Sequence, residues 1–299
     1  MKEGRFFLPS SGGRVECVLC PRHCVLSPGQ TGFCGVRANR EGKGLSLNYG
    51  SLSAVQIDPI EKKPLSHFKP GTDILSLGSY GCNLSCLYCQ NHQIARDSDL
   101  FRFARGGEEI TPSMILEQLA APLAGVAYTY NEPTVWWEFM IDCAGLVKEK
   151  GFANVMVTNG YIEPEPLREL LPLIDAFSVD LKGYSEEFYR DVSGGRLAPV
   201  KRTLKSIVEA GRHLEVEYLV VPGKNDEEAS FEELMLWYAR ELGADVPLHI
   251  NRYFPRHKMS LPATPIDRLL ALYDIACKYL SHVHIGNAQV DLSKRRSQP

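Results

Sequence analysis

Residues 81–91 give the strongest indication of the architecture of this chain and read Gly81-Cys82-Asn83-Leu84-Ser85-Cys86-Leu87-Tyr88-Cys89-Gln90-Asn91. They come directly after Asp73–Ser79, an apolar run that we expect to form a buried strand. Three thiolates within eight residues can wrap one side of a compact iron–sulfur cluster, and four-iron clusters usually take four protein thiolates. The local count of three leaves one iron without a protein ligand, as catalytic zinc sites also leave a position open. A zinc site that borrows a distant fourth ligand is the alternative.

From about residue 71 onward, short β-rich runs alternate with amphipathic segments. The expected strands are Asp73–Ser79, Val126–Asn131, Asn154–Thr158, Ala176–Leu181, Leu214–Val221 and Leu248–Phe254, with a short β-like run at Val283–Ile285. The expected helices lie near Pro112–Leu123, Thr134–Lys150, Glu165–Leu171, Val200–Ala210, Glu228–Leu242 and Pro265–Leu280. About six such repeats predict an α/β fold, in which helices cover a parallel sheet. The sheet would be either open and doubly wound or a partial barrel of the TIM type.

The composition excludes several classes of protein. The 299 residues include 33 Lys and Arg against 36 Asp and Glu, a net charge of −3, so the chain has no global field for a polyanion and we expect no nucleic-acid partner. No apolar run reaches about 18 residues, so we expect no membrane span. The N-terminus leads into no apolar stretch long enough for a signal peptide, and we therefore expect a cytoplasmic protein.

The nine cysteines fall into two tight groups and two single positions. The first group lies in a Cys-, Gly- and Pro-punctuated region over residues 1–70, has the spacing C-x2-C-x3-C-x9-C and comprises Cys17, Cys20, Cys24 and Cys34. In a reducing cytosol, clustered thiols indicate metal ligands or catalytic groups. Four thiolates would close a tetrahedral structural zinc site; a second cluster, or free thiols or a disulfide, are the alternatives. Cys143 and Cys277 lie on helical apolar stripes, so we expect both to be packed core thiols.

The spacing of the second cysteine group, with the aromatic Tyr88 before the last cysteine, resembles the signature of the radical S-adenosylmethionine (SAM) enzymes. The resemblance implies a [4Fe-4S] cluster on Cys82, Cys86 and Cys89, with Tyr88 at the cofactor site. It also implies that the open iron binds the amino and carboxylate groups of SAM. The reduced cluster would cleave SAM to a 5′-deoxyadenosyl radical, which abstracts hydrogen from a substrate carbon.

The second expected strand ends in a run that looks like the Gly-Gly-Glu-Pro motif of that family, Tyr130-Asn131-Glu132-Pro133, although the glycines are replaced here. In the family this motif receives the SAM ammonium, a partner that suits a carboxylate. The resemblance therefore implies a cofactor-binding role for Asn131 and Glu132. A helix cap before Pro133 is the alternative.

Later strand ends match the activating-enzyme branch of the family, and the resemblance implies that they lie at the SAM site and bind the cofactor. Thr158 and Asn159 precede a glycine, as in that branch, and a plain turn is the alternative. Asp180 and Lys182 stand two residues apart, so both face the same side of a strand, and a surface ion pair is the alternative. His249 on the sixth strand is either a cofactor-binding residue or a satisfied core histidine.

Together these segments resemble the pyruvate formate-lyase activating enzymes and, more closely, the radical SAM enzymes of the AmmeMemoRadiSam system. The closer resemblance rests on residues 17–24, 32–37, 60–68, 130–134 and 285–287. It implies a partial (β/α)6 barrel of the radical SAM type over residues 71–299, with the cluster on the loop after the first strand. Residues 1–70 would form a small Cys-rich region with a metal site.

The implied activity is that of a radical SAM enzyme, an activating-enzyme-like oxidoreductase, that abstracts hydrogen from an unidentified substrate, with a protein or peptide residue favoured. Its partners would be SAM and a reducing electron donor of the flavodoxin or ferredoxin type. One alternative is an activating enzyme for a glycyl-radical enzyme. The alternative from another class is a non-catalytic iron–sulfur or zinc protein that transfers electrons or acts as a scaffold.

Overall fold

The computed structural model describes residues 1–97 and 109–292 of the chain. Within these residues an eight-stranded sheet forms the body of the molecule, in the spatial order β14-β13-β12-β11-β10-β9-β8-β7. β7 (Ala54–Pro59) lies at one edge and pairs antiparallel with β8, and every other pairing in this sheet is parallel. The parallel strands are β8 (Asp73–Gly78), β9 (Gly125–Tyr128), β10 (Ala153–Thr158), β11 (Ala176–Asp180), β12 (His213–Val220), β13 (Leu248–Arg252) and β14 (Val283–Gly286).

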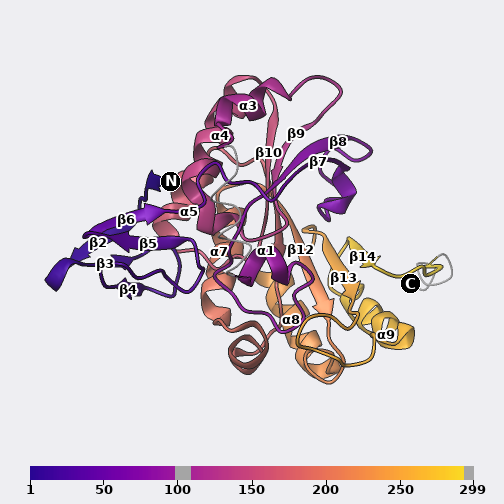
Figure 1. Cartoon of the computed structure of the whole chain (residues 1–299). Coiled ribbons are helices and arrows are strands. Elements are labelled where there is room, and N and C mark those ends of the chain that lie inside the picture. The colour runs from indigo at the N-terminus through magenta and orange to yellow at the C-terminus, as the bar shows by residue number, and fades with distance from the viewer. Residues whose placement is uncertain (98–108, 293–299) are drawn as a thin grey trace.

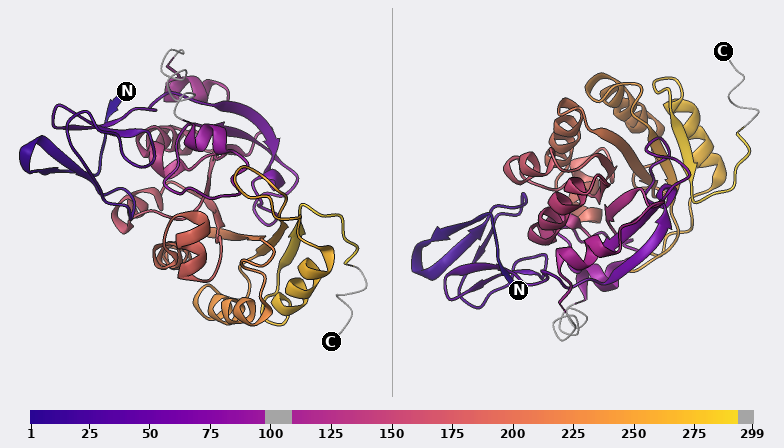
Figure 2. Two further views of the ribbon diagram at one scale, coloured as in Figure 1. Left: turned by 60° about the horizontal axis from the view of Figure 1, so that its bottom comes forward. Right: turned by 90° about the horizontal axis from the view of Figure 1, so that it is seen from above.

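Helices connect the parallel strands, and the longer ones lie along the outer side of the curved sheet (Figures 1 and 2). The connecting helices are α1 (His92–Arg96) and α3 (Pro112–Glu117) after β8, α4 (Trp137–Glu149) after β9, α5 (Pro164–Leu170) after β10, α6 (Glu186–Phe188) and α7 (Leu197–Glu209) after β11, α8 (Glu228–Glu241) after β12, and α9 (Ile266–Ala276) after β13. The α/β fold and the partial barrel of the TIM type are therefore confirmed.

Local sequence explains several of these elements. Thr111 caps α3, because its side-chain oxygen accepts a hydrogen bond from the Met114 N–H, and Pro112 takes the first helical position. In α7 the buried residues Val200, Leu204 and Ile207 recur at intervals of three and four, which places them on one face against the sheet.

Some expectations about the elements were wrong in detail, including the helix expected near Pro112–Leu123, which ends at Glu117. The strand expected to reach Asn131 ends at Tyr128, because Tyr130 has a φ of +68° and leaves the extended conformation. Cys143 is buried in α4 as expected, but Cys277 is exposed. Cys277 lies at the C-cap of α9, one position beyond the buried Ala276, so the helical stripe has left the core there.

The N-terminal residues form two small antiparallel sheets beside the barrel (indigo in Figure 1). One contains β1 (Lys2–Glu3), β6 (Lys43–Ser46) and β5 (Arg37–Arg40), and the other contains β2 (Phe7–Ser10), β3 (Arg14–Cys17) and β4 (Cys24–Leu26). An ion pair of 2.9 Å between Arg37 and Glu138 of α4, each 2% exposed, attaches them to the barrel. Since β7 also belongs to residues 1–70, part of that segment contributes to the main sheet.

The segment after β7 closes the amino-terminal end of the barrel. Ile60 and Leu65 pack there against Ile74 and other buried residues from the starts of the strands. The buried Glu215 of β12 accepts hydrogen bonds from the backbone N–H groups of Ser66 and His67, at 2.9 and 2.8 Å. The barrel can therefore take a ligand only toward its other end. In the described part of the chain, no helix is long and apolar enough to cross a membrane.

Candidate active site

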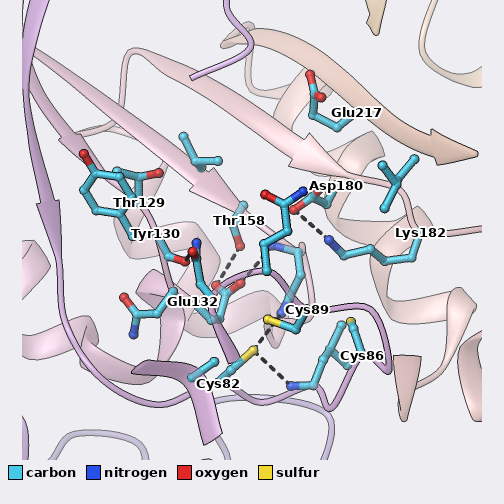
Figure 3. Close-up of a pocket in the computed structure, with 18 of the residues that line it drawn as sticks. Cys82, Cys86, Cys89, Thr129, Tyr130, Glu132, Thr158, Asp180, Lys182 and Glu217 are labelled. Atoms are coloured by element: carbon cyan, nitrogen blue, oxygen red, sulfur yellow. Dashed lines mark hydrogen bonds and ion pairs between the residues drawn. The ribbon is translucent and has the colours of Figure 1, made fainter. Parts of the chain in front are cut away.

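The residues predicted from the strand ends line one pocket of about 410 Å³, within the range of roughly 300–1,000 Å³ that small-molecule sites occupy. Figure 3 shows this pocket, with the cysteines on one side and Glu217 on the other. The predicted residues in its wall are Cys82, Cys86, Tyr88, Cys89, Asn131, Glu132, Thr158, Asn159, Asp180 and Lys182. Because the carboxyl ends of parallel strands meet at one edge of a sheet, loops far apart in the sequence converge here.

The loop that carries the three cysteines is fixed by backbone contacts. The N–H of Ser85 donates to the Ser193 carbonyl at 2.9 Å, and the N–H of Leu87 donates to the Val192 carbonyl at 3.0 Å. Gly81 starts the loop with a φ of +92°, and a Cβ at this position would lie 2.7 Å from the Cys34 carbonyl oxygen. Only glycine fits there, so the loop is held between the barrel and the N-terminal region.

The chemistry of these donors fits an iron–sulfur cluster. Three thiols from one loop share the wall of one pocket, and Cys82 Sγ already lies 3.4 Å from the Leu84 N–H and 3.7 Å from Asn159 Nδ2, the kind of donors that tune cluster sulfurs. Across residues 1–97 and 109–292, no three His, Cys, Asp or Glu side chains stand close enough together to hold a metal ion as they are. The assignment of an iron–sulfur cluster therefore rests on the three thiol donors and on their common place in the wall of one pocket.

Two residues of the pocket wall each carry a buried polar atom without a partner in the described part of the chain. The hydroxyl of Tyr88 and Oε1 of Glu217 are both buried, and neither has a hydrogen-bond partner among the described residues. Both side chains line the pocket. A buried polar group without a partner costs about 1–3 kcal/mol, so a ligand that satisfies both atoms would be stabilised by them.

Glu132 connects the ends of two neighbouring strands. Its carboxylate accepts hydrogen bonds from the Thr158 hydroxyl at 2.7 Å, from the Asn159 N–H at 2.8 Å and from the Thr134 N–H at 3.0 Å. Burial raises the pKa of Glu132, and these donors oppose the rise. The contact with Thr134 caps the 3-10 turn η3 (Pro133–Trp136), as the capping alternative predicted.

Asn131 braces the start of the cysteine loop. Its Oδ1 accepts from the Ser79 N–H at 3.0 Å, and its Nδ2 donates to the Gly81 carbonyl at 2.9 Å. Both Asn131 and Glu132 therefore reach the pocket wall while they also hold the backbone around it.

Asp180 and Lys182 form an ion pair of 2.8 Å in the pocket wall. Burial opposes the charge of Lys182, but the Asp180 carboxylate together with Tyr88 and Cys86 outweighs it and raises the pKa of the lysine. The ammonium also counteracts the rise that burial causes in the pKa of the Cys86 thiol. Lys182 thus places an ammonium beside the cysteine loop, where it favours thiolates, while the Asp180 carboxylate opposes this effect.

The structure places His249 below the pocket, which favours the alternative of a satisfied core histidine over a cofactor-binding role. His249 does not line the pocket, and its Nε2 lies 2.7 Å from Oε2 of the buried Glu215. Asn251, two residues later on the same face of β13, lines the pocket instead. Strand β13 was predicted correctly, but the residue on it that reaches the pocket was not.

Sequence reasoning missed several residues of the pocket wall. Glu217 shares a face of β12 with Glu215 and accepts a hydrogen bond from Asn251 Nδ2. Burial, together with the charge of Asp180, raises the pKa of Glu217 well above the ordinary value. Alternation along β12 could have indicated an inward acid. Lys62, Lys63 and Tyr130 also line the pocket.

A second cluster of polar groups lies at the pocket edge formed by β7. Asp58 of β7 accepts from Lys63 Nζ at 2.7 Å and from the Tyr130 hydroxyl at 2.5 Å. Tyr130 keeps its left-handed conformation, which is unusual for an aromatic residue, while its ring is held by this contact. No periodicity in the first 70 residues pointed to Asp58.

The four N-terminal cysteines surround a separate small cavity of about 10 Å³, which Asn83 of the cysteine loop also lines. Burial raises the pKa of the Cys34 thiol to about 11. Arg37 Nε donates to Cys17 Sγ at 3.3 Å, a contact that would stabilise a thiolate. A cavity of this size has room for about one atom-sized guest.

A half-open parallel barrel with a thiol triplet on the loop after its first parallel strand, facing a ligand pocket at the strand ends, defines a cluster-dependent enzyme. Residues 77–235 match the family description "Radical SAM superfamily". The chain belongs to the radical SAM superfamily and is an enzyme. The alternative of a non-catalytic carrier or scaffold is therefore not supported.

Comparison with individual proteins agrees with this family. The chain is 40% identical over 96% of its length to "Uncharacterized protein MJ0808" of Methanocaldococcus jannaschii, of which the match covers 85%. It is 27% identical to the pyruvate formate-lyase-activating enzyme of Clostridium pasteurianum over 52% of this chain and 64% of that enzyme, just under two thirds. The crystal structure of a radical SAM methyltransferase from Sphaerobacter thermophilus has the same fold, with a TM-score of 0.54 and 17% identity over 76% of this chain and 70% of that one.

Proposed function

We propose that this enzyme binds a [4Fe-4S] cluster on Cys82, Cys86 and Cys89 and uses SAM to abstract hydrogen from a protein or peptide residue. The observation that carries the proposal is one pocket wall that combines three thiols with the Asp180–Lys182 pair and two unpartnered polar atoms. When bound, the cluster supplies the electron that cleaves SAM to a 5′-deoxyadenosyl radical.

The chain's own residues would bind and orient SAM. Lys182 provides a positive charge beside the cluster, and Asn131 and Glu132 hold the loop backbone in place. Tyr88 and Glu217 each present a polar atom to the ligand. The closed amino-terminal end of the barrel limits access of water from that side.

The activating-enzyme relatives and the resemblance to AmmeMemoRadiSam enzymes support a protein or peptide as the substrate. A relative named as a pyruvate formate-lyase-activating enzyme favours a second candidate, the activation of a glycyl-radical enzyme. In both cases the hydrogen is taken from a residue of a polypeptide. We further propose that the enzyme works in the cytoplasm, where its clustered thiols stay reduced.

We also propose that Cys17, Cys20, Cys24 and Cys34 hold one zinc ion. The cavity between them is small, about 10 Å³, which favours a single ion over a second cluster. Asn83 lines this cavity and donates to the Tyr161 carbonyl at 2.7 Å, so the zinc would stabilise the start of the cysteine loop.

The experiment is anaerobic reconstitution with iron and sulfide, reduction with dithionite, addition of SAM and measurement of 5′-deoxyadenosine. The wild-type protein is expected to form the product, and Cys86→Ala is expected to form none. Cys143→Ala removes a buried thiol away from the pocket and serves as the matched control that keeps activity. No product from a fully loaded wild-type protein contradicts the proposal.

A further inference from the structure

An exposed loop after β13 lies directly on the cysteine loop. The N–H of Lys258 donates to the carbonyl of Leu87, between the second and third cysteines, at 2.9 Å. Tyr253 and Met259 at the two ends of this outer loop (Phe254–Lys258) are buried, and a pair of hydrogen bonds between Arg256 and Met259 closes its turn. The outer loop is thus the surface that separates this side of the cysteine loop from solvent.

Two stacked histidines connect the third cysteine to this surface. His92 Nδ1 lies 3.3 Å from the Cys89 carbonyl oxygen. The ring of His92 stacks on the ring of His257, with centroids 4.3 Å apart and planes at 21°. His257 is exposed at the tip of the outer loop. Because electron transfer through protein falls off steeply with distance, close contacts from a cluster ligand to the surface favour this point of entry.

The charge of the outer loop contrasts with that of the chain as a whole. Arg256 and Lys258 are exposed and flank His257, and neither side chain has an ion pair or hydrogen bond within the described residues. Phe254, at the start of the loop, is 40% exposed. Two unpaired cations and an exposed aromatic ring therefore stand on a chain whose net charge is −3.

We propose that the outer loop, together with His92, is the docking surface for the one-electron donor, a small acidic redox protein of the flavodoxin or ferredoxin class. The inference rests on the proposed function, because a cluster on the three cysteines must be reduced before SAM is cleaved. The donor is oxidised by one electron and the cluster is reduced by one, with no bond made or broken at the docking surface. Opposite charges speed such an encounter, and electron-transfer complexes are among the smallest specific interfaces, below about 1,200 Å².

The test compares two reductants on the reconstituted full-length enzyme. The double variant Arg256→Glu/Lys258→Glu is assayed for 5′-deoxyadenosine with photoreduced flavodoxin and, separately, with excess dithionite. The flavodoxin-driven rate is expected to fall about tenfold or more and to lose its dependence on salt. The dithionite-driven rate is expected to stay within about twofold of the wild type. Lys69→Glu/Lys278→Glu changes the net charge equally on other exposed positions and should leave both rates unchanged.

An unchanged flavodoxin-driven rate overturns the docking site. An equal loss with both reductants also overturns it, because the outer loop would then only support the cysteine loop. The neutral variant Arg256→Gln/Lys258→Gln guards against disruption by the new acids and should show a smaller, flavodoxin-specific loss. A wild-type enzyme that forms no product with dithionite contradicts the proposed function instead, so the two failures are distinguishable.

Discussion

The hydroxyl of Thr158 donates a hydrogen bond of 2.7 Å to the buried carboxylate of Glu132, and this contact ties the end of β10 to the loop after β9. It fixes two strand ends at the point where the cysteine loop meets the pocket. Thr158→Val keeps the shape of the side chain and removes the donor, so we expect a loss of about 1–3 kcal/mol in the free energy of unfolding. Urea denaturation measures this loss. Thr158→Ser retains the hydroxyl and should lose much less, and equal losses for the two variants would show that the hydrogen bond is not the cause.

The buried pair of Arg37 and Glu138 gives a second prediction. Glu138→Gln leaves the guanidinium, which is 2% exposed, without its counter-charge, so we expect a destabilisation of about 3–5 kcal/mol. Arg190→Gln breaks the exposed pair with Asp191 and is the control, for which we expect a far smaller loss because solvent screens the pair. Thermal and denaturant unfolding of both variants provide the comparison. Similar small effects in the two variants would rule out Arg37 as the anchor of the N-terminal sheets.

The raised pKa of Glu217 predicts a pH-dependent effect. Because the folded-state pKa lies above the unfolded value of ~4.3, the folded protein keeps a proton that the unfolded chain releases. The stability that Glu217 contributes is therefore full below about pH 4.3 and is lost as the pH rises toward the folded pKa. Glu217→Gln mimics the neutral acid, so its free energy of unfolding should match that of the wild type below about pH 4 and exceed it at pH 8. A difference that does not grow with pH would contradict a protonated Glu217.

Metal analysis provides a separate prediction for the two cysteine groups. We expect about four iron ions and about one zinc ion per reconstituted chain. Cys20→Ala should lose the zinc and keep most of the iron, whereas Cys86→Ala should lose the iron and keep the zinc. Mass spectrometry of the metals in both variants decides this. Loss of both metals from either single variant would show that the two sites do not form independently.

The sequence was sufficient for the parallel sheet and for most of the pocket, for a physical reason. Parallel strands present their carboxyl ends at one edge, so polar residues at the ends of separate strands, such as Asn131, Thr158 and Lys182, had to meet. The order of residues at strand ends does not predict how deep along the barrel a side chain lies. His249 and Asn251 share one face of β13, and only the tertiary structure shows that His249 pairs with Glu215 beneath the pocket.

Other parts of the site come from an element that gave no sequence signal. β7 pairs antiparallel at the edge of the sheet and lies in the Cys-rich region, where no periodicity marked it. Asp58 of β7 brings Lys63 and Tyr130 together only through this pairing. A contact between an edge strand and a distant loop depends on register, and register is set by the folded sheet.

An open iron at the cysteine triplet is the central requirement of the proposed chemistry. Electron paramagnetic resonance of the anaerobically reconstituted, dithionite-reduced protein, recorded with and without SAM, tests it. We predict the signal of a reduced [4Fe-4S] cluster that changes when SAM is added and is missing from Cys86→Ala. A spectrum that SAM leaves unchanged, or a protein that binds only zinc at Cys82, Cys86 and Cys89, would contradict the account.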